Sequence, residues 1–215
     1  MKPIITVVTP TTGDKFVYEA IASVARQTVP VNHLVVVDGA EYKLEPHLLA
    51  ELHHDNLHVV YLPFNTGKES GRVYYYGHRV YASMSFAINT PFMSFLDEDN
   101  LLQPDWAEKM LHAMSQGDYD AVTCRRNVLY QDGRVLCKDD FESVDNSFFD
   151  TSTFLWYTKS FANKYASKFG YEPWGFDRYL SHALMDSGKY KHIEEYLVDY
   201  RSPERLYEFF KHYSK

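Results

Sequence analysis

Three consecutive carboxylates, Asp97, Glu98 and Asp99, follow directly after an apolar run at residues 92–96. Like charges this close repel one another, and each carboxylate loses favourable hydration when it is buried. Two carboxylates separated by one residue can share a hard divalent cation such as Mg²⁺ or Mn²⁺, which prefers oxygen ligands. The alternative interpretation is a solvated acidic turn that caps the next helix. The buried strand predicted just before the cluster favours a functional site.

Predicted strands and helices alternate through the first half of the chain. Short apolar runs typical of buried strands lie at 4–9, 33–38, 56–62 and 92–96, and helical patterns lie at 15–27, 45–54, 72–89 and 104–117. This alternation predicts a mainly parallel α/β sheet covered by helices on both faces. Ligands bind at the carboxyl ends of such strands. Thr9, Asp38 and Asp97 are all expected there, which places the acidic cluster at a site.

The second half of the chain has a less regular pattern. Residues 120–130 and 134–140 are expected to pair as a hairpin around the turn at Asp132 and Gly133, and residues 158–170 and 176–188 are predicted helices. We find no internal repeat, linker or low-complexity segment. We therefore expect one domain over residues 1–215.

The composition indicates a soluble protein of a reducing compartment. The net charge of -7 provides no basic footprint for nucleic acid or an anionic membrane. No apolar stretch approaches the length of a membrane span, and the two cysteines do not suggest a disulfide framework. The chain also lacks the P-loop, the dinucleotide-binding fingerprint after the first strand and the hydrolase nucleophile elbow. These features predict a cytoplasmic location and exclude several common nucleotide-binding classes.

Six segments follow one another in an order that is known from one enzyme family. They are VVTPTTGDKFVYEAIASVARQT from residue 7, HLVVVDGA from 33, FNTGKESGR from 64, FMSFLDEDNLLQPDW from 92, GYEPWGFDRYLSHALMDSGKY from 170 and LVDYRS from 197. Together they resemble the family 2 glycosyltransferases, which have the GT-A fold. The similarity covers most of the chain. Each motif alone is weak, and their order carries the resemblance.

The resemblance implies that a nucleotide-diphosphate sugar lies across the strand ends. Thr9, Pro10 and Thr11 would line the base, and Asp38 would accept a hydrogen bond from a uracil imide. Arg72 would lie near the base or the phosphates, with Arg79 as the second choice. Asp97 would face the ribose or sugar hydroxyls and share the metal site. Asp99 would hold Mn²⁺ or Mg²⁺ on the diphosphate.

The resemblance also implies an acceptor side. Asp177 stands at the position of the general base that an inverting transfer needs, and it is also a candidate helix N-cap. The neighbouring residues Trp174, Gly175 and Phe176 would shape the acceptor pocket.

The chain departs from the family pattern at two points. Phe176 stands where the family usually has Glu, and residues 202–204 lack the His that follows Tyr-Arg in many relatives. His182 and His192 are the candidates for a third metal ligand.

We therefore expect a metal-dependent, inverting glycosyltransferase with a UDP-sugar donor. Residues 1–100 would form the nucleotide-sugar-binding half, and residues 101–215 the acceptor-side half. A glycan, a lipid-linked glycan, a protein or a modified nucleobase remains open as the acceptor. Two alternatives are a nucleotidyltransferase of related fold and a non-catalytic nucleotide- or sugar-binding relative. The first usually has a Gly-rich loop after strand one, which TPTTGD lacks, and the second would bind without turnover.

Overall fold

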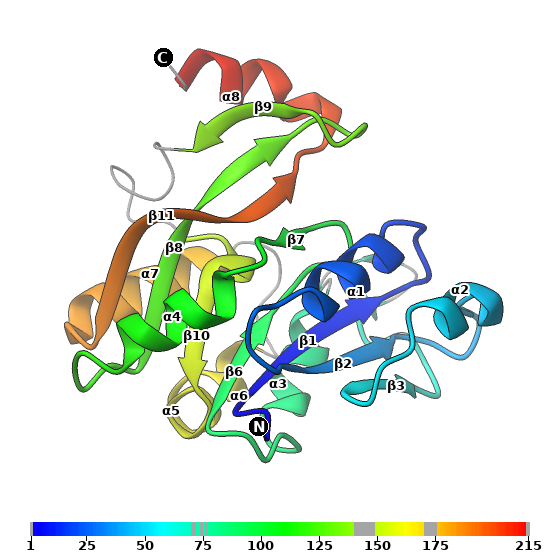
Figure 1. The fold of residues 1–215 in the computed structure, drawn as a ribbon, viewed down its shortest axis with the longest axis horizontal. Helices are drawn as coiled ribbons and strands as arrows, with labels where there is room; N and C mark the ends of the chain where they lie inside the picture. The colour runs from blue at the N-terminus through cyan, green and yellow to red at the C-terminus, as the bar shows by residue number, and fades with distance from the viewer. Residues whose placement is uncertain are drawn as a thin grey trace.

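The computed structural model describes residues 2–69, 72–73, 75, 77–139, 149–169 and 176–213. Their central feature is a mixed sheet with the strand order β3-β2-β1-β6-β10-β8-β11-β7, to which β9 is added by pairing with β8 (Figure 1). A separate small ribbon pairs β4 (Lys68–Glu69) with β5 (Arg72–Val73). Helices lie against both faces of the central sheet, as the alternating pattern predicts.

The first half of the sheet is parallel, as expected. Its strands are β1 (Ile5–Thr11), β2 (Asn32–Val37), β3 (Leu57–Tyr61) and β6 (Phe92–Phe95). The helices that follow these strands are α1 (Val17–Ala25), α2 (Pro46–Glu51), α3 (His78–Met84) and α4 (Trp106–Met114). Every residue of β1 is buried. Because neighbouring side chains of a strand point to opposite faces, Val7 packs with Trp106 of α4, whereas Val8 packs in the cluster that contains Val80 of α3.

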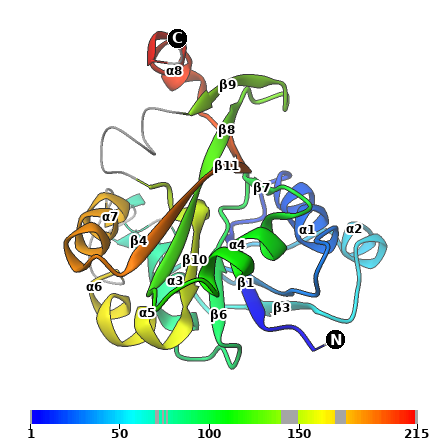
Figure 2. The same ribbon diagram turned by 60° about the vertical axis from the view of Figure 1, so that its left-hand side comes forward.

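The second half of the sheet mixes directions. Its strands are β7 (Leu101–Leu102), β8 (Ala121–Leu129), β9 (Val135–Asp139), β10 (Phe154–Tyr157) and β11 (Tyr190–Arg201). β10 is antiparallel to both β6 and β8, and β11 is parallel to β8. The hairpin predicted around Asp132 is confirmed, with Gly133 at a φ of 85°. β8 and β11 run side by side beyond the rest of the sheet to β9 and α8 (Tyr207–Tyr213) (Figures 1 and 2).

Two predicted helices differ from the structure. The helix predicted over 72–89 is α3 alone, because it begins at His78 after Gly77. A Cβ at Gly77 would lie 2.4 Å from Cγ of Pro10, so this backbone approaches β1 too closely for a side chain. The helix predicted over 158–170 is divided at Tyr165 into α5 (Thr158–Lys164) and α6 (Ala166–Phe169).

The helix predicted over 176–188 is confirmed as α7 (Phe176–Ser187), which ends before Gly188 at a φ of 64°. A residue with positive φ just past the last turn is a common way to end a helix. α7 begins with Phe176 and Asp177, so it presents the predicted general base in its first turn. Among the described helices, none is long and apolar enough to cross a lipid bilayer.

Candidate active site

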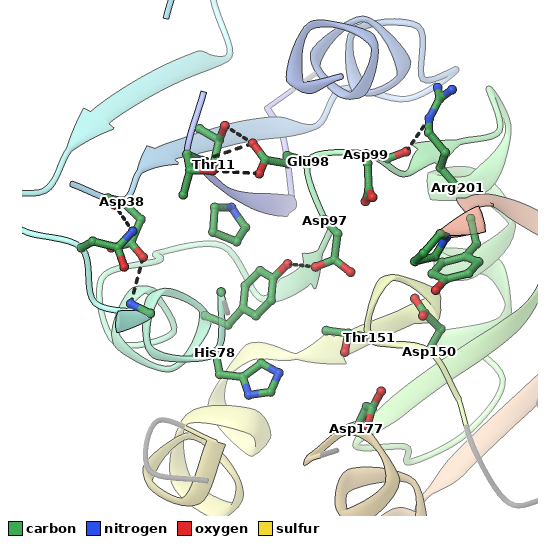
Figure 3. Close-up of a pocket in the computed structure, with 18 of the residues that line it drawn as sticks. Thr11, Asp38, His78, Asp97, Glu98, Asp99, Asp150, Thr151, Asp177 and Arg201 are labelled. Atoms are coloured by element: carbon green, nitrogen blue, oxygen red, sulfur yellow. Dashed lines mark hydrogen bonds between the residues drawn. The ribbon is translucent and has the colours of Figure 1, made fainter. Parts of the chain in front are cut away.

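A pocket of about 510 Å³ lies where β1, β2 and β6 end (Figure 3). The sheet brings together residues that are far apart in the sequence. Among the residues that line the pocket are Pro10, Thr11, Asp38, Asn65, Gly67, Lys68, Tyr81, Asp97, Glu98, Asp99, Asp150, Thr151, Asp177, Tyr200, Arg201 and Arg205. Six of the sequence-predicted site residues are in this list: Pro10, Thr11, Asp38, Asp97, Asp99 and Asp177.

Glu98 ties the acidic turn to the loop after β1. Its carboxylate accepts hydrogen bonds from the Thr11 hydroxyl, from the Thr12 backbone N–H at 3.2 Å and from the Asp14 backbone N–H at 3.3 Å. Burial raises the pKa of Glu98, and these hydrogen bonds oppose the rise because they favour the charged form. The middle carboxylate of the cluster therefore holds the loop that carries Thr11.

Asp97 lies at the centre of the pocket and is held by a tyrosine. The Tyr81 hydroxyl donates to Oδ1 of Asp97 at 2.6 Å, and the Asp97 backbone N–H donates to the Ser152 hydroxyl at 3.3 Å. Burial, followed by the charges of Asp150 and Asp99, raises the pKa of Asp97 well above its ordinary value. The tyrosine thus fixes one of the two carboxylate oxygens of Asp97.

Asp99 is placed by the chain segment that ends β11. Its backbone carbonyl accepts from Nε of Arg201 at 3.2 Å, and the Arg201 backbone N–H donates to Oδ1 of Asn100 at 3.0 Å. Burial raises the pKa of Asp99 to about 6; the charges of Glu98 and Asp150 add to the rise, and Arg201 opposes it. The guanidinium also pairs with Glu19 of α1 at 2.7 Å. Arg201 thus fixes the turn that carries Asp99 between two elements.

Asp38 is 3% exposed and organises the loop after β3. Oδ1 accepts from the Thr66 backbone N–H at 2.7 Å, and Oδ2 accepts from the Thr66 hydroxyl at 3.1 Å and the Gly67 backbone N–H at 3.2 Å. A carboxylate has about four acceptor positions, so three are used here by the protein. The Asn-x-Gly segment is therefore bound to the aspartate that ends the second strand.

Asp177 faces the same pocket from the first turn of α7. Its Oδ1 accepts from the Arg178 backbone N–H at 2.8 Å. Burial raises the pKa of Asp177 to about 6, and the charge of Asp150 adds to the rise, whereas Arg126 and Arg178 oppose it. A carboxyl group with a pKa near 6 is a stronger base than an ordinary aspartate and is still ionised at neutral pH.

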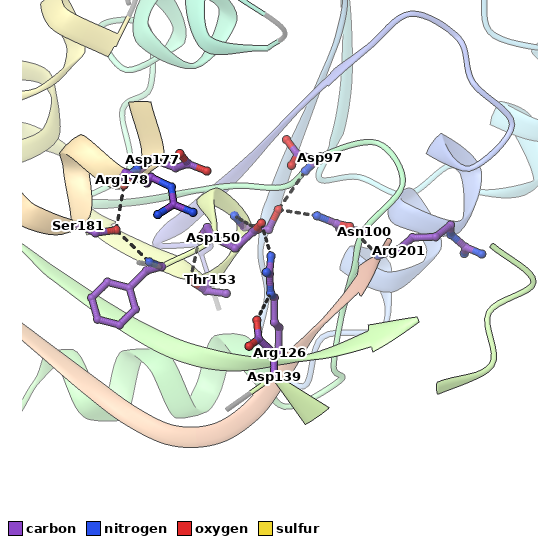
Figure 4. A network of polar contacts seen from close by, with 12 residues as sticks. Asp97, Asn100, Arg126, Asp139, Asp150, Thr153, Asp177, Arg178, Ser181 and Arg201 are labelled. Atoms are coloured by element: carbon purple, nitrogen blue, oxygen red, sulfur yellow. Dashed lines mark hydrogen bonds and ion pairs between the residues drawn. The ribbon is translucent and has the colours of Figure 1, made fainter. Parts of the chain in front are cut away.

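Asp150 is a pocket residue to which the sequence analysis assigned no role (Figure 4). Its Oδ2 accepts from Nη1 of Arg126 at 2.5 Å, and its Oδ1 accepts from the Ser152 backbone N–H at 2.9 Å. Arg126 also donates from Nε to Asp139 at 2.7 Å. The one sequence signal is an Asp-x-Ser pattern typical of a capped turn, which says nothing about a pocket. Tyr200 and Arg205 line the pocket as well and were also missed.

Other predicted residues lie elsewhere. Thr9 is fully buried within β1, where its hydroxyl bonds to Nε2 of His33 at 2.9 Å, and it does not line the pocket. Thr9 lies two residues before the end of β1 and stays inside the sheet, whereas Thr11, on the same face, reaches the pocket where the strand ends. Arg72 lies in β5. Arg79 donates to the Thr66 carbonyl at 3.2 Å from outside the pocket lining.

The remaining acceptor-side and metal-ligand predictions have mixed outcomes. Trp174 and Gly175 lie outside the described residues, and Phe176 begins α7. His182 does not line the pocket. His192 also lies outside the lining; its Nδ1 bonds to the Thr123 hydroxyl at 2.8 Å. Neither histidine is placed as a third metal ligand.

The pocket carboxylates fit a hard divalent cation. Within the described part of the chain, no three His, Cys, Asp or Glu side chains form a metal-holding group. Asp97 and Asp99 nevertheless line one pocket. Besides burial, the charges of Asp150 and Asp99 raise the pKa of Asp97, and the charges of Glu98 and Asp150 raise the pKa of Asp99. A cation between them would relieve this repulsion. Mg²⁺ sites often combine one or two carboxylates with water and substrate phosphates, and Asp97 and Asp99 are donors of this type.

The mixed sheet, with carboxylates where its central strands end, is the GT-A glycosyltransferase fold. The family model described as Glycosyl transferase family 2 matches residues 6–169. The chain belongs to this family, so both the fold class and the family expected from the sequence are confirmed. The family is one of glycosyltransferases, which is the class expected from the sequence.

Solved structures with the same fold include two of S. aureus TarS 1-349. The structure in complex with UDP has a TM-score of 0.70 at 16% identity, over 97% of this chain and 63% of that chain. The structure in complex with UDP-GlcNAc has a TM-score of 0.69 at 15% identity, over 95% of this chain and 59% of that chain. The chain thus spans less than two thirds of these proteins, and the likeness shows the fold alone. No curated protein matches the chain significantly in sequence.

Proposed function

We propose that the chain transfers a sugar from a nucleotide-diphosphate donor, a UDP-sugar, to an acceptor hydroxyl. One observation carries the proposal: a single pocket holds the ends of β1 and β2, the Asp97 and Asp99 pair, and Asp177. The family supports glycosyl transfer. The UDP and UDP-GlcNAc complexes of TarS, which shares the fold, support the choice of a uridine nucleotide.

The donor base would lie between the ends of β1 and β2, against Pro10 and Thr11. Asp38 uses three of about four acceptor positions for the loop at residues 66–67. The fourth position would accept the imide N–H of uracil. In this proposal residues 1–100 supply these groups and form the nucleotide-sugar-binding half, and residues 101–215 supply Asp177 on the acceptor side.

Asp99, together with Asp97, would hold Mg²⁺ or Mn²⁺. When bound, the cation would supply positive charge for the oxygens of the leaving diphosphate. Asp97 would keep one oxygen on Tyr81 and turn the other toward the cation or the donor hydroxyls. Glu98 would be a positioning residue, because it fixes the loop that contacts the base.

Asp177 would act as the general base of an inverting transfer. Its carboxylate would take the proton from the acceptor hydroxyl, on the face opposite the leaving diphosphate. The acceptor oxygen would then form a bond to the anomeric carbon as the bond from that carbon to the diphosphate breaks. A base whose pKa is about 6 suits this step at neutral pH.

Calorimetry with UDP, GDP, CDP and dTDP, each with Mn²⁺ and with EDTA, tests the donor half. We expect UDP to bind in the presence of Mn²⁺ and to bind at least about tenfold more weakly in EDTA. Binding of another nucleotide alone would overturn the choice of uracil. Equal binding in EDTA would overturn the metal. The absence of binding by all four nucleotides would overturn the proposed function.

A further inference from the structure

One half of the pocket lies away from the ends of β1 and β2. Asp150, Thr151 and Asp177, which all carry side-chain oxygens, line this half (Figure 3). Asp150 and Thr151 come from the turn before β10, and Asp177 comes from α7. Asp97 and Asp99 separate this half from the base-binding end of the pocket. If Asp177 is the base, an acceptor must lie against Asp150 and Thr151.

The Asp150 carboxylate is held in a fixed orientation and has acceptor capacity to spare. Its side chain is 10% exposed; Oδ2 accepts a hydrogen bond from Arg126, and Oδ1 accepts one from the Ser152 backbone N–H. An ionised carboxylate can accept about four hydrogen bonds. About two positions therefore remain for hydroxyl donors from the pocket.

The Thr151 hydroxyl supplies an independent observation. Thr151 is 6% exposed and lines the pocket. Its neighbours Ser152 and Thr153 bond within the turn, to Asp150. Within the described chain, the Thr151 hydroxyl has no hydrogen-bond partner, and it is not among the buried polar atoms that are closed off from solvent. The hydroxyl is thus open to the pocket, where it can bond to water or to a bound ligand.

The charge of this half disfavours an anionic acceptor. The Arg126 guanidinium, which pairs with Asp150, is bound by Asp139 as well, so two carboxylates balance its single charge (Figure 4). Arg178 is exposed and lies outside the pocket lining. A phosphate or carboxylate placed beside Asp150 and Asp177 would meet like charge in a desolvated site.

We propose that the acceptor is an uncharged sugar ring with two neighbouring hydroxyls. This inference rests on the proposed function. One hydroxyl gives its proton to Asp177 and its oxygen attacks the anomeric carbon, while the nucleoside diphosphate leaves. The adjacent hydroxyl donates to Asp150 and accepts from Thr151. Asp150 and Thr151 are thus specificity-determining residues that read the hydroxyl next to the reacting one.

The test compares matched acceptors that differ in one charge. UDP release from UDP-glucose, UDP-galactose and UDP-N-acetylglucosamine is measured with methyl glucoside or methyl galactoside, and then with the corresponding methyl uronides. We expect a neutral acceptor to accelerate UDP release and its uronide to be at least about tenfold less effective in kcat/KM. Equal use of both members of a pair, or no acceleration by any neutral member, would overturn the inference.

Variants locate the effect. Asp150→Asn and Thr151→Ala are expected to raise the acceptor KM about tenfold or more, since each removes a hydrogen bond to the acceptor. Asp132→Asn, the same change at an exposed carboxylate outside the pocket, should leave the acceptor KM unchanged. An unchanged acceptor KM in both pocket variants would refute the assignment. If the wild type does not bind UDP, the proposed function itself is refuted. Failure of the acceptor inference and failure of the proposed function are therefore distinguishable.

Discussion

The buried ion cluster around Arg126 allows a stability prediction whose size can be worked from the structure. The side chains of Arg126, Asp139 and Asp150 are 3%, 1% and 10% exposed, and the guanidinium is the cation that both carboxylates share. Arg126→Met keeps much of the side-chain volume and removes the charge. Breaking a buried ion pair by removing one partner costs about 3–5 kcal/mol, because the remaining charge is left uncompensated. Here two carboxylates lose their partner, so we expect a loss at the upper end of this range.

Urea unfolding at pH 8, followed by tryptophan fluorescence, measures this loss because Trp106 and Trp156 are fully buried. The matched control is Arg134→Met, which breaks an exposed pair with Asp132 and should change stability far less, because solvent screens exposed ion pairs. A change in the Arg126→Met variant no larger than in this control would refute the reasoning.

Substitutions at three pocket residues give further predictions. Asp177→Asn should keep UDP binding and lower the rate of transfer by about 10²–10⁴-fold. In steady-state kinetics the wild-type rate should rise with pH through about 6, as Asp177 loses its proton. Transfer by the variant at the wild-type rate would show that Asp177 is not the base. Asp99→Ala should abolish the Mn²⁺-dependent part of UDP binding in calorimetry, and an unchanged metal dependence would remove the metal assignment. Glu98→Ala releases the loop after β1 and should weaken UDP binding about tenfold or more. Glu98→Gln keeps an acceptor oxygen and should recover part of the affinity. Equal UDP affinities of the wild type and both variants would show that Glu98 does not position this loop for binding.

The parallel half of the fold and its acidic site follow from local sequence pattern. Asp38 and Asp97 each follow an apolar run, which places them at the carboxyl ends of strands, and both line the pocket. The helix that begins near Asp177 was predicted from its spacing and from Gly188. These features depend on neighbouring residues in the chain, so the sequence reveals them directly.

Other features depend on contacts between distant segments. Glu98 bonds to a loop that lies more than eighty residues earlier in the chain, and no local pattern shows this. The sequence around Asp150 is typical of an ordinary turn. Its ion pair with Arg126 forms only because β8 brings Arg126 beside it. Thr9 was expected at the site because it ends an apolar run, but β1 continues to Thr11, so Thr9 lies inside the sheet and bonds to His33. The predicted helix from Arg72 is shorter because Gly77 packs against Pro10.

The most direct measurement for the central claim is a crystal structure of the chain with UDP and Mn²⁺. We expect electron density for the diphosphate beside Asp97 and Asp99, with the cation between the carboxylates and the phosphate oxygens. The uracil should lie against Pro10 and Thr11, with its imide N–H directed at Asp38. Density for UDP at another place on the protein, with the carboxylate pocket holding no nucleotide, would contradict the account.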